Sequence, residues 1–239
     1  MNKLVAPIAF ATAAIFSTAA FAADPVTFDY PVFKDYVPPV DEGLMGSFYL
    51  RGSAAGNYAW GREARHPETG EIFEITEGGW GYSAGIGAGY ETGTGLRFDA
   101  TVDYLLNNDM TADVPDGLGD RSLELRSTIA LANVYYDFGL GGDGLTAAGG
   151  TFGYVGAGAG VAFNESRVTD NVGPGEWGSN TSFAAAGMAG VGYDFGAVVA
   201  DLGYRALYIN SIENDNSTPP YAIDDTLIHE IRATVRYRF

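Results

Sequence analysis

The chain has 239 residues, a formal net charge of −17 and no cysteine, and glycine (34), tyrosine (15) and phenylalanine (14) are abundant. The absence of cysteine excludes a disulfide framework, a thiol nucleophile, a thiolate metal site and a lipid-modified cysteine anchor. With only 18% charged residues, the composition matches neither a helical enzyme nor a disordered chain.

The N-terminus has the pattern of a secretory signal peptide. Met1-Asn2-Lys3 is a short basic region, residues 4–16 form an apolar run, and Ala20-Phe21-Ala22 is a small-residue cleavage triplet. The apolar run is too short for a membrane anchor, since a spanning helix needs about 20 such residues. We therefore expect residues 1–22 to be removed by cleavage after Ala22, which changes the formal charge to −18 because Lys3 is lost.

Residues 23–43 have no regular pattern and contain Pro25, Pro31, Pro38 and Pro39, so they are predicted to be a proline-rich periplasmic leader. No later stretch of about 18 apolar residues exists that would form a transmembrane helix. Only a soluble fold or a closed membrane barrel remains for residues 44–239.

Eight segments of strand character follow the leader. Alternation of apolar with polar residues is clearest in 96–104 and 231–239, and a period of two indicates a strand with one apolar and one polar face. The predicted strands are about 45–57, 79–91, 96–107, 122–138, 151–163, 181–195, 198–210 and 226–239.

The links between these segments alternate in length. The links after the second, fourth and sixth segments are short or glycine-rich (92–95, 139–150 and 196–197). The other four are long and acidic (about 58–78, 108–121, 164–180 and 211–225). This alternation predicts an all-β fold: an eight-stranded antiparallel transmembrane β-barrel with short periplasmic turns and four long external loops.

Aromatic residues recur where the even-numbered segments end. If these rings face outward, they form an aromatic girdle at the inner membrane interface. The predicted girdle residues are Tyr90, Tyr136, Phe138, Tyr193 and Phe195.

Counting in twos from these rings assigns the two faces of each strand. The residues expected to face outward are Trp80, Tyr82, Ile86, Leu96, Phe98, Val102, Val191, Ile231, Val235 and Phe239. The residues expected to form a lumen charge network are Arg51, Glu91, Arg97, Asp99, Asp103, Asp201, Arg205, Glu230, Arg232 and Arg236. Because isolated charges in a narrow lumen are costly, opposite signs must pair across strands.

The segment 122–138 does not fit one parity, because Leu123 and Leu125 disagree with Tyr136 and Phe138 if both sets face outward. A β-bulge between residues 128 and 133 would reconcile them. Under that hypothesis, Glu124 and Arg126 lie inside the barrel or above the membrane.

The repeated Tyr-Asp-Phe-Gly strand ends, Gly85-Ile86-Gly87-Ala88-Gly89-Tyr90 and the alternating final strand resemble the small OmpA-like and opacity-type outer-membrane barrels. The resemblance spans Gly46 to Phe239 and is closest to the alphaproteobacterial surface antigens. It implies an insertion signal in the last strand, carried by Val235, Tyr237 and Phe239, that is read by the barrel-assembly machinery. Members of this family commonly stabilise the envelope or face the host.

Catalysis and pore formation are the alternatives. His66 and His229 lack a spaced acid–base partner, and Ser211 with Glu213 or Asp224 with Asp225 are more simply solvated loop residues, so we expect no catalytic residues. An envelope enzyme acting on lipid A is therefore the least favoured alternative. Eight strands enclose a lumen that side chains fill, which leaves at most a small porin with a narrow ion path.

The long links carry most of the negative charge. Their acidic residues are Glu63, Glu68, Glu71, Glu74, Glu77, Asp109, Asp113, Asp116, Asp120, Glu213, Asp215, Asp224 and Asp225. Their spacing matches no calcium loop, so neither metal nor cofactor is expected. The expected partners are outer-membrane lipid and lipopolysaccharide, the barrel-assembly machinery and a host or envelope ligand at the loops, with no nucleic acid. The expected location is the cell outer membrane.

Overall fold

A computed structural model describes residues 46–61, 63–65, 72–112, 121–140, 150–170, 173–217 and 220–239. The predicted signal peptide and leader lie outside these residues. The strands are β1 (Ser47–Trp60), β2 (Glu63–Arg65), β3 (Ile72–Glu77), β4 (Gly79–Glu91), β5 (Leu96–Ala112), β6 (Arg121–Gly139), β7 (Gly150–Thr169), β8 (Gly178–Asp194), β9 (Val198–Asn214) and β10 (Tyr221–Arg238). Within the described ranges, no helix has the length and apolar character to cross a membrane.

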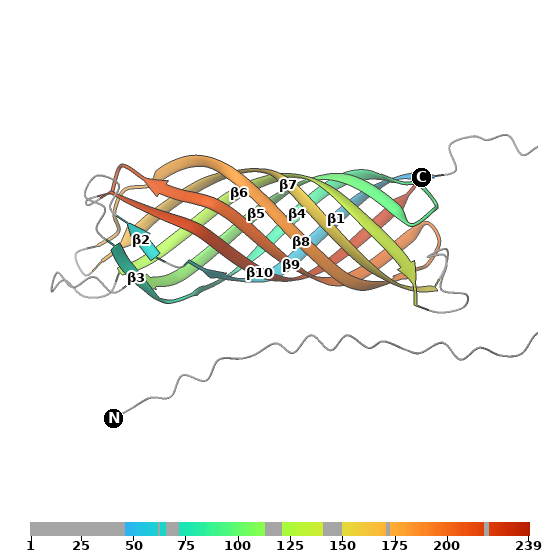
Figure 1. The fold of residues 1–239 in the computed structure, drawn as a ribbon, viewed down its shortest axis with the longest axis horizontal. Helices are drawn as coiled ribbons and strands as arrows, with labels where there is room; N and C mark the ends of the chain where they lie inside the picture. Colours follow the sequence, from blue (N-terminus) through green and yellow to red (C-terminus); the bar gives the residue numbers. More distant parts are fainter. Residues whose placement is uncertain are drawn as a thin grey trace, which may run out of the picture. The chain divides into compact units, whose positions relative to one another are not determined.

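The long strands form a closed antiparallel barrel (Figure 1). Each pairs with the next long strand along the chain, and β1 pairs with β10 from Tyr49↔Arg238 to Trp60↔Leu227. The predicted eight-stranded barrel is therefore confirmed. We call the end with the short links 92–95 and 195–197 the turn end, and the opposite end the loop end.

The short strands β2 and β3 prolong β1 and β4 toward the loop end. The pairing of Arg65 with Ala222 continues the register that places Trp60 opposite Leu227. On the other side, β3 pairs with β5 at Ile75↔Ala112. The wall thus keeps eight strands around its circumference, and much of the first long link is strand and not loop.

Most strands are longer than the sequence predicted. The largest, β7, has 20 residues, whereas a tilted strand needs only about 9–11 residues to cross a membrane. The barrel wall therefore extends well beyond the thickness of a bilayer, and this extension lies at the loop end, where the links were expected to be irregular.

The ten residues assigned outward, from Trp80 to Phe239, are all exposed, which confirms that part of the assignment. Ile86 on the outer face of β4, for example, is 73% exposed, whereas Arg97 on the inner face of β5 is 2% exposed. The outer face is apolar and the inner face carries the charges, as expected of a membrane barrel and opposite to a soluble sandwich.

The prediction of a β-bulge between residues 128 and 133 is wrong. β6 pairs with β7 without interruption from Ser122↔Thr169 to Gly139↔Phe152. Leu123 and Leu125 face the lumen, in the same parity as Tyr135 and Asp137, and the rings of Tyr136 and Phe138 lie on the outer side. The predicted bulge depended on leucine in a membrane strand facing lipid, whereas these two leucines belong to the apolar cluster inside the barrel.

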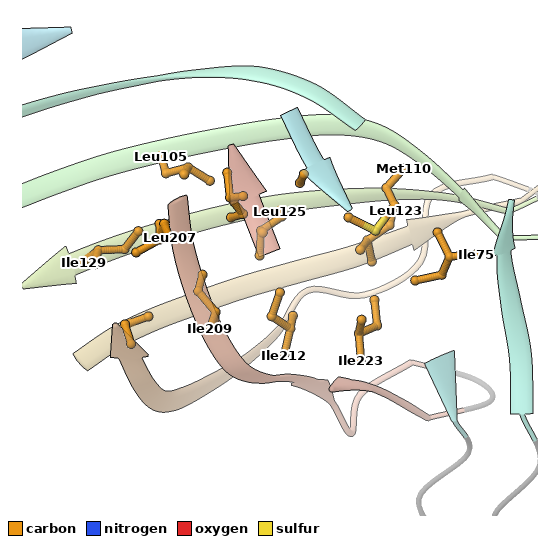
Figure 2. Packing of buried hydrophobic residues seen from close by; sticks show 14 of the residues in the cluster. Ile75, Leu105, Met110, Leu123, Leu125, Ile129, Leu207, Ile209, Ile212 and Ile223 are labelled. Carbon is orange, nitrogen blue, oxygen red and sulfur yellow. The ribbon is translucent and has the colours of Figure 1, made fainter. Parts of the chain in front are cut away.

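The loop-end half of the lumen holds a cluster of apolar side chains, shown in Figure 2, together with buried amides such as those of Asn107, Asn164 and Asn214. We call this cluster the loop-end core. Its members include Ile75, Leu105, Met110, Leu123, Leu125, Ile129, Leu131, Leu207, Ile209, Ile212, Tyr221, Ile223 and Ile228. Where the wall extends beyond the bilayer, its outer face meets water, so the interior is the place where apolar side chains gain by burial.

Candidate functional site

The turn-end half of the lumen holds charged and aromatic side chains. Arg51 of β1 donates to the Asp99 carboxylate of β5 at 2.8 Å and to the Tyr135 hydroxyl at 2.9 Å. The Tyr49 hydroxyl donates to the same carboxylate at 2.9 Å. These groups are buried, and each charged group has a hydrogen-bond partner from another strand, as buried polar groups require.

A second cluster lies toward the turn end of the lumen. Arg97 binds both carboxylate oxygens of Asp137 at 3.0 Å, and its guanidinium lies 3.9 Å from the centre of the Tyr135 ring. Arg236 lies between three carboxylates, 3.5 Å from Glu91, 3.6 Å from Asp137 and 3.8 Å from Asp201. This arrangement ties β5, β6, β9 and β10 together across the lumen.

A third cluster lies toward the middle of the barrel. Arg205 donates to Asp103 at 2.8 Å and to Glu230 at 2.5 Å, and Arg232 donates to the same two carboxylates at 2.7 and 3.1 Å. The Ser83 hydroxyl adds a bond to Glu230 at 2.7 Å. Removing water from four charges is expensive, and this alternation of signs offsets that cost.

The structure places all ten residues of the predicted lumen charge network on the inner side of the wall and gives each an ion pair with an opposite charge. Sequence reasoning missed Asp137, Asp194 and Arg238, which belong to the same network. Asp137 lies between two outward aromatics, Tyr136 and Phe138, so parity alone would have placed it inside.

Glycine provides the space for these large side chains. Several inward positions of β4 are glycine, and bulky groups of β1 and β5 lie over them. A Cβ atom at Gly89 would lie 2.5 Å from the Tyr49 ring, and one at Gly85 would lie 2.0 Å from the Asp103 carboxylate. The Gly-x-Gly-x-Gly segment is therefore a packing feature of the filled lumen.

Side chains of the described residues occupy the lumen over most of its length. Between the charged clusters lies a cavity of about 10 Å³, lined by Arg51, Tyr154, Asp201, Arg205 and others. This volume holds about one water molecule. Beyond it toward the loop end, the loop-end core occupies the interior.

The predicted girdle residues lie on the exterior at the turn end. Tyr136 contacts Phe138 with ring centres 6.4 Å apart, Tyr193 contacts Phe195 at 4.6 Å, and Tyr90 packs on Phe48 at 5.0 Å. A second aromatic row, which the sequence argument did not recognise, lies toward the loop end. It consists of Trp60, Trp80, Tyr82, Tyr104, Phe163 and Phe183, all exposed.

The apolar belt between the two rows has the height of a membrane. On β6, the outward positions run from the Tyr136 ring to Arg126, the first charged residue, ten positions along the strand. At about 3.3 Å per residue and a tilt of about 40°, this corresponds to about 25 Å. Membrane barrels have an apolar band of about this height.

The residues considered for catalysis do not form a common site in the described part of the chain. His229 is on the outer face with its Nδ1 atom 2.5 Å from the Tyr204 hydroxyl, while Ser211 donates to Glu213 at 2.7 Å on β9. Asp224 pairs with Arg65. His66 and the acidic residues Glu68, Glu71, Asp113, Asp116 and Asp120 lie outside the described residues.

The residues predicted to carry the insertion signal lie at the end of the β1–β10 strand pair that closes the barrel, which we call the seam. Val235 and Tyr237 are exposed on the outer face of β10, beside β1, and Phe239, which follows the strand, is exposed as well. The backbone N–H of Phe239 donates to the carbonyl oxygen of Phe48 at 3.0 Å, which is the last bond of the closing strand pair.

Comparison with known proteins supports the fold. No protein-family model matches the chain, and no curated protein matches it. Among solved structures, the Neisserial surface protein A is 24% identical, covers 80% of this chain and 97% of its own length, and superposes with a TM-score of 0.50. The chain has the fold of a small outer-membrane β-barrel.

Weaker likenesses extend to two further barrels. Ail of Yersinia pestis is 15% identical over 80% of this chain and 99% of its own, with a TM-score of 0.37. The outer membrane protein OprG of Pseudomonas aeruginosa is 14% identical over 81% of this chain and 97% of its own, with a TM-score of 0.45.

Proposed function

We propose that this protein is a non-enzymatic outer-membrane barrel that strengthens the envelope and presents a recognition surface at its loop end. The observation that carries the proposal is the filled lumen, in which paired charges occupy the turn-end half and the loop-end core occupies the other half. A barrel built in this way is a rigid support, because opening a path through it would break buried ion pairs or expose apolar side chains.

The route to this location is part of the proposal. The signal peptide of residues 1–22 directs export and is cleaved after Ala22, and the barrel-assembly machinery reads Val235, Tyr237 and Phe239. The apolar belt then matches the hydrocarbon layer, and the strands of the loop end stand above it.

The recognition surface is the acidic loop end. Glu77, Glu176, Glu213, Asp215 and Asp225 are exposed there. Carboxylates at this level favour divalent ions that bridge to lipopolysaccharide phosphates, or a basic host or envelope ligand.

Conductance separates this proposal from a small porin. Purified protein is inserted into planar bilayers, with a wide porin as the positive control. We expect no stepwise conductance, because neither half of the lumen offers a hydrated path. Regular openings would instead favour the narrow ion path and would contradict the rigid-support role.

A deletion strain tests the envelope role directly. Loss of the protein is expected to increase sensitivity to detergent and to chelators of divalent ions, and the wild-type chain supplied in trans should restore resistance. Lipid A from the two strains is compared by mass spectrometry, and an altered lipid A structure would favour the enzyme alternative.

A further inference from the structure

A groove of about 520 Å³ lies on the exterior of β5 to β8, level with the loop-end aromatic row. Its lining is amphipathic. The exposed side chains of its lining that matter here are Tyr104, Arg126, Phe163, Glu165, Ser179 and Thr181. Aromatic rings thus meet a guanidinium, a carboxylate and hydroxyl groups in one depression.

Arg126 and Glu165 are directly opposite each other on β6 and β7, and both are exposed. The Arg126 guanidinium is turned to the Trp177 ring, 4.3 Å from its centre. Among the residues that the structure describes, neither Arg126 nor Glu165 has an oppositely charged group within 4.0 Å. The groove therefore contains one cation and one anion that form no ion pair with another described residue.

The neighbouring arginine, Arg167, shows that the lack of an oppositely charged partner is specific to Arg126. Arg167 also lies over the Trp177 ring, at 4.7 Å, but it binds both carboxylate oxygens of Glu124 at 2.9 and 2.8 Å. The charge of Arg167 is therefore matched within the protein.

Arg126 and Glu165 also lie at a defined height on the outer wall of the barrel. From the turn end, Arg126 and Glu165 are the first charged residues on the outer faces of β6 and β7. They are about 25 Å above the turn-end aromatic row, where hydrocarbon gives way to lipid headgroups. Tyr104 and Phe163 lie immediately below them, on the apolar side.

We propose that this groove binds the phosphoethanolamine headgroup of a membrane lipid. The phosphate accepts hydrogen bonds from Arg126, which presents a fork of N–H donors, and the ammonium donates to Glu165. The Ser179 and Thr181 hydroxyls donate to the ester oxygens, and the lipid chain runs down over Tyr104 and Phe163. The inference rests on the proposed membrane location.

Other headgroups fit this set of side chains less well. A phosphoglycerol group carries a net negative charge and leaves Glu165 without a cation, so the two anions repel. A phosphocholine group has a cation without N–H donors, so it cannot hydrogen-bond the Glu165 carboxylate. The unmatched pair therefore selects a zwitterion with a primary ammonium.

Native mass spectrometry of the refolded, full-length mature barrel tests the proposal. The protein is released from mixed micelles that contain equal amounts of phosphatidylethanolamine, phosphatidylglycerol and phosphatidylcholine, and the retained lipid is identified. We expect phosphatidylethanolamine to be retained about tenfold over each of the other two, the effect of one charge-assisted hydrogen bond. Equal retention of the three lipids, or preference for another, overturns the proposal.

Three variants assign the effect to the groove. Glu165→Gln should abolish the preference and Arg126→Gln should lower the retention of all three lipids, while the matched control Arg167→Gln should change neither. Heat-modifiable migration in gels shows that each variant has formed the barrel, so loss of fold is distinguished from loss of lipid selectivity. A preference that survives Glu165→Gln, or retention that is unchanged in Arg126→Gln, overturns the assignment.

A final comparison identifies the source of the headgroup. Lipid A with and without a phosphoethanolamine substituent replaces the phospholipids, and retention of the substituted form alone would make a glycolipid the ligand. If neither the phospholipid nor the substituted lipid A is retained while the barrel migrates as folded, the headgroup proposal fails and the membrane location stands.

Discussion

Asp103 of β5 and Glu230 of β10 are bound by the same two guanidiniums, those of Arg205 and Arg232. Both carboxylates are buried, with side chains 1% and 0% exposed. The two acids are thus held together by a pair of shared cations in the middle of the lumen. Each charge in this group depends on the other three.

Asp103→Asn should strongly destabilise the barrel. Removing one carboxylate leaves Arg205 and Arg232 to share a single anion in a buried site, which typically costs about 3–5 kcal/mol. Urea titration of the protein in detergent, followed by gel mobility, measures this loss. Asp225→Asn is the matched control, since Asp225 is exposed and its φ of 54° is tolerated by asparagine. Equal stability of the two variants would mean that the shared cations contribute nothing.

Gly89→Ala should destabilise the barrel by about 1–3 kcal/mol through overpacking. Its new Cβ atom would lie 2.3 Å from the carbonyl oxygen of Phe98 and 2.5 Å from the Tyr49 ring. Gly52→Ala is the control, because a Cβ atom there meets nothing within 4 Å. The same unfolding assay is used. Unchanged stability of Gly89→Ala would show that the lumen has space for the extra methyl group at this level.

Single-cysteine labelling tests the orientation of the barrel in the membrane. The chain has no cysteine, so Asp215→Cys at the loop end and Ala197→Cys at the turn end each introduce one thiol. A membrane-impermeant maleimide applied to intact cells should label the first variant and not the second. Both should react once the outer membrane is permeabilised, and labelling of Ala197→Cys on intact cells would reverse the orientation.

Deletion of Phe239 should slow insertion more than it weakens the finished barrel. The residue is 70% exposed and supplies one backbone hydrogen bond to Phe48 at the seam, so little packing is lost. Pulse-labelled cells should show a delayed appearance of the heat-modifiable form, with protease-sensitive chain in the periplasm. Phe239→Tyr keeps an aromatic terminus and should insert at the normal rate. Normal kinetics for the deletion would contradict an assembly role for this terminus.

The sequence determined the number of strands, their order and most of their facing. Alternation in 96–104 and 231–239 separates an apolar from a polar face directly, because successive side chains of a strand point to opposite sides. The parity of short and long links then distinguished a barrel from a sandwich. Both signals are local, so they can be read without knowing any contact across the barrel.

The tertiary structure decided which charges pair and where the lumen becomes apolar. The Arg205 guanidinium lies 2.8 Å from the Asp103 carboxylate, although the two residues are more than 100 positions apart in sequence. They meet because strand stagger around the closed wall brings these parts of β5 and β9 to the same height inside the barrel. Leu123 and Leu125 point inward for a related reason. Periodicity gives the two faces of β6, but only the height of each residue relative to the apolar belt decides whether an apolar side chain gains more by facing lipid or by filling the interior.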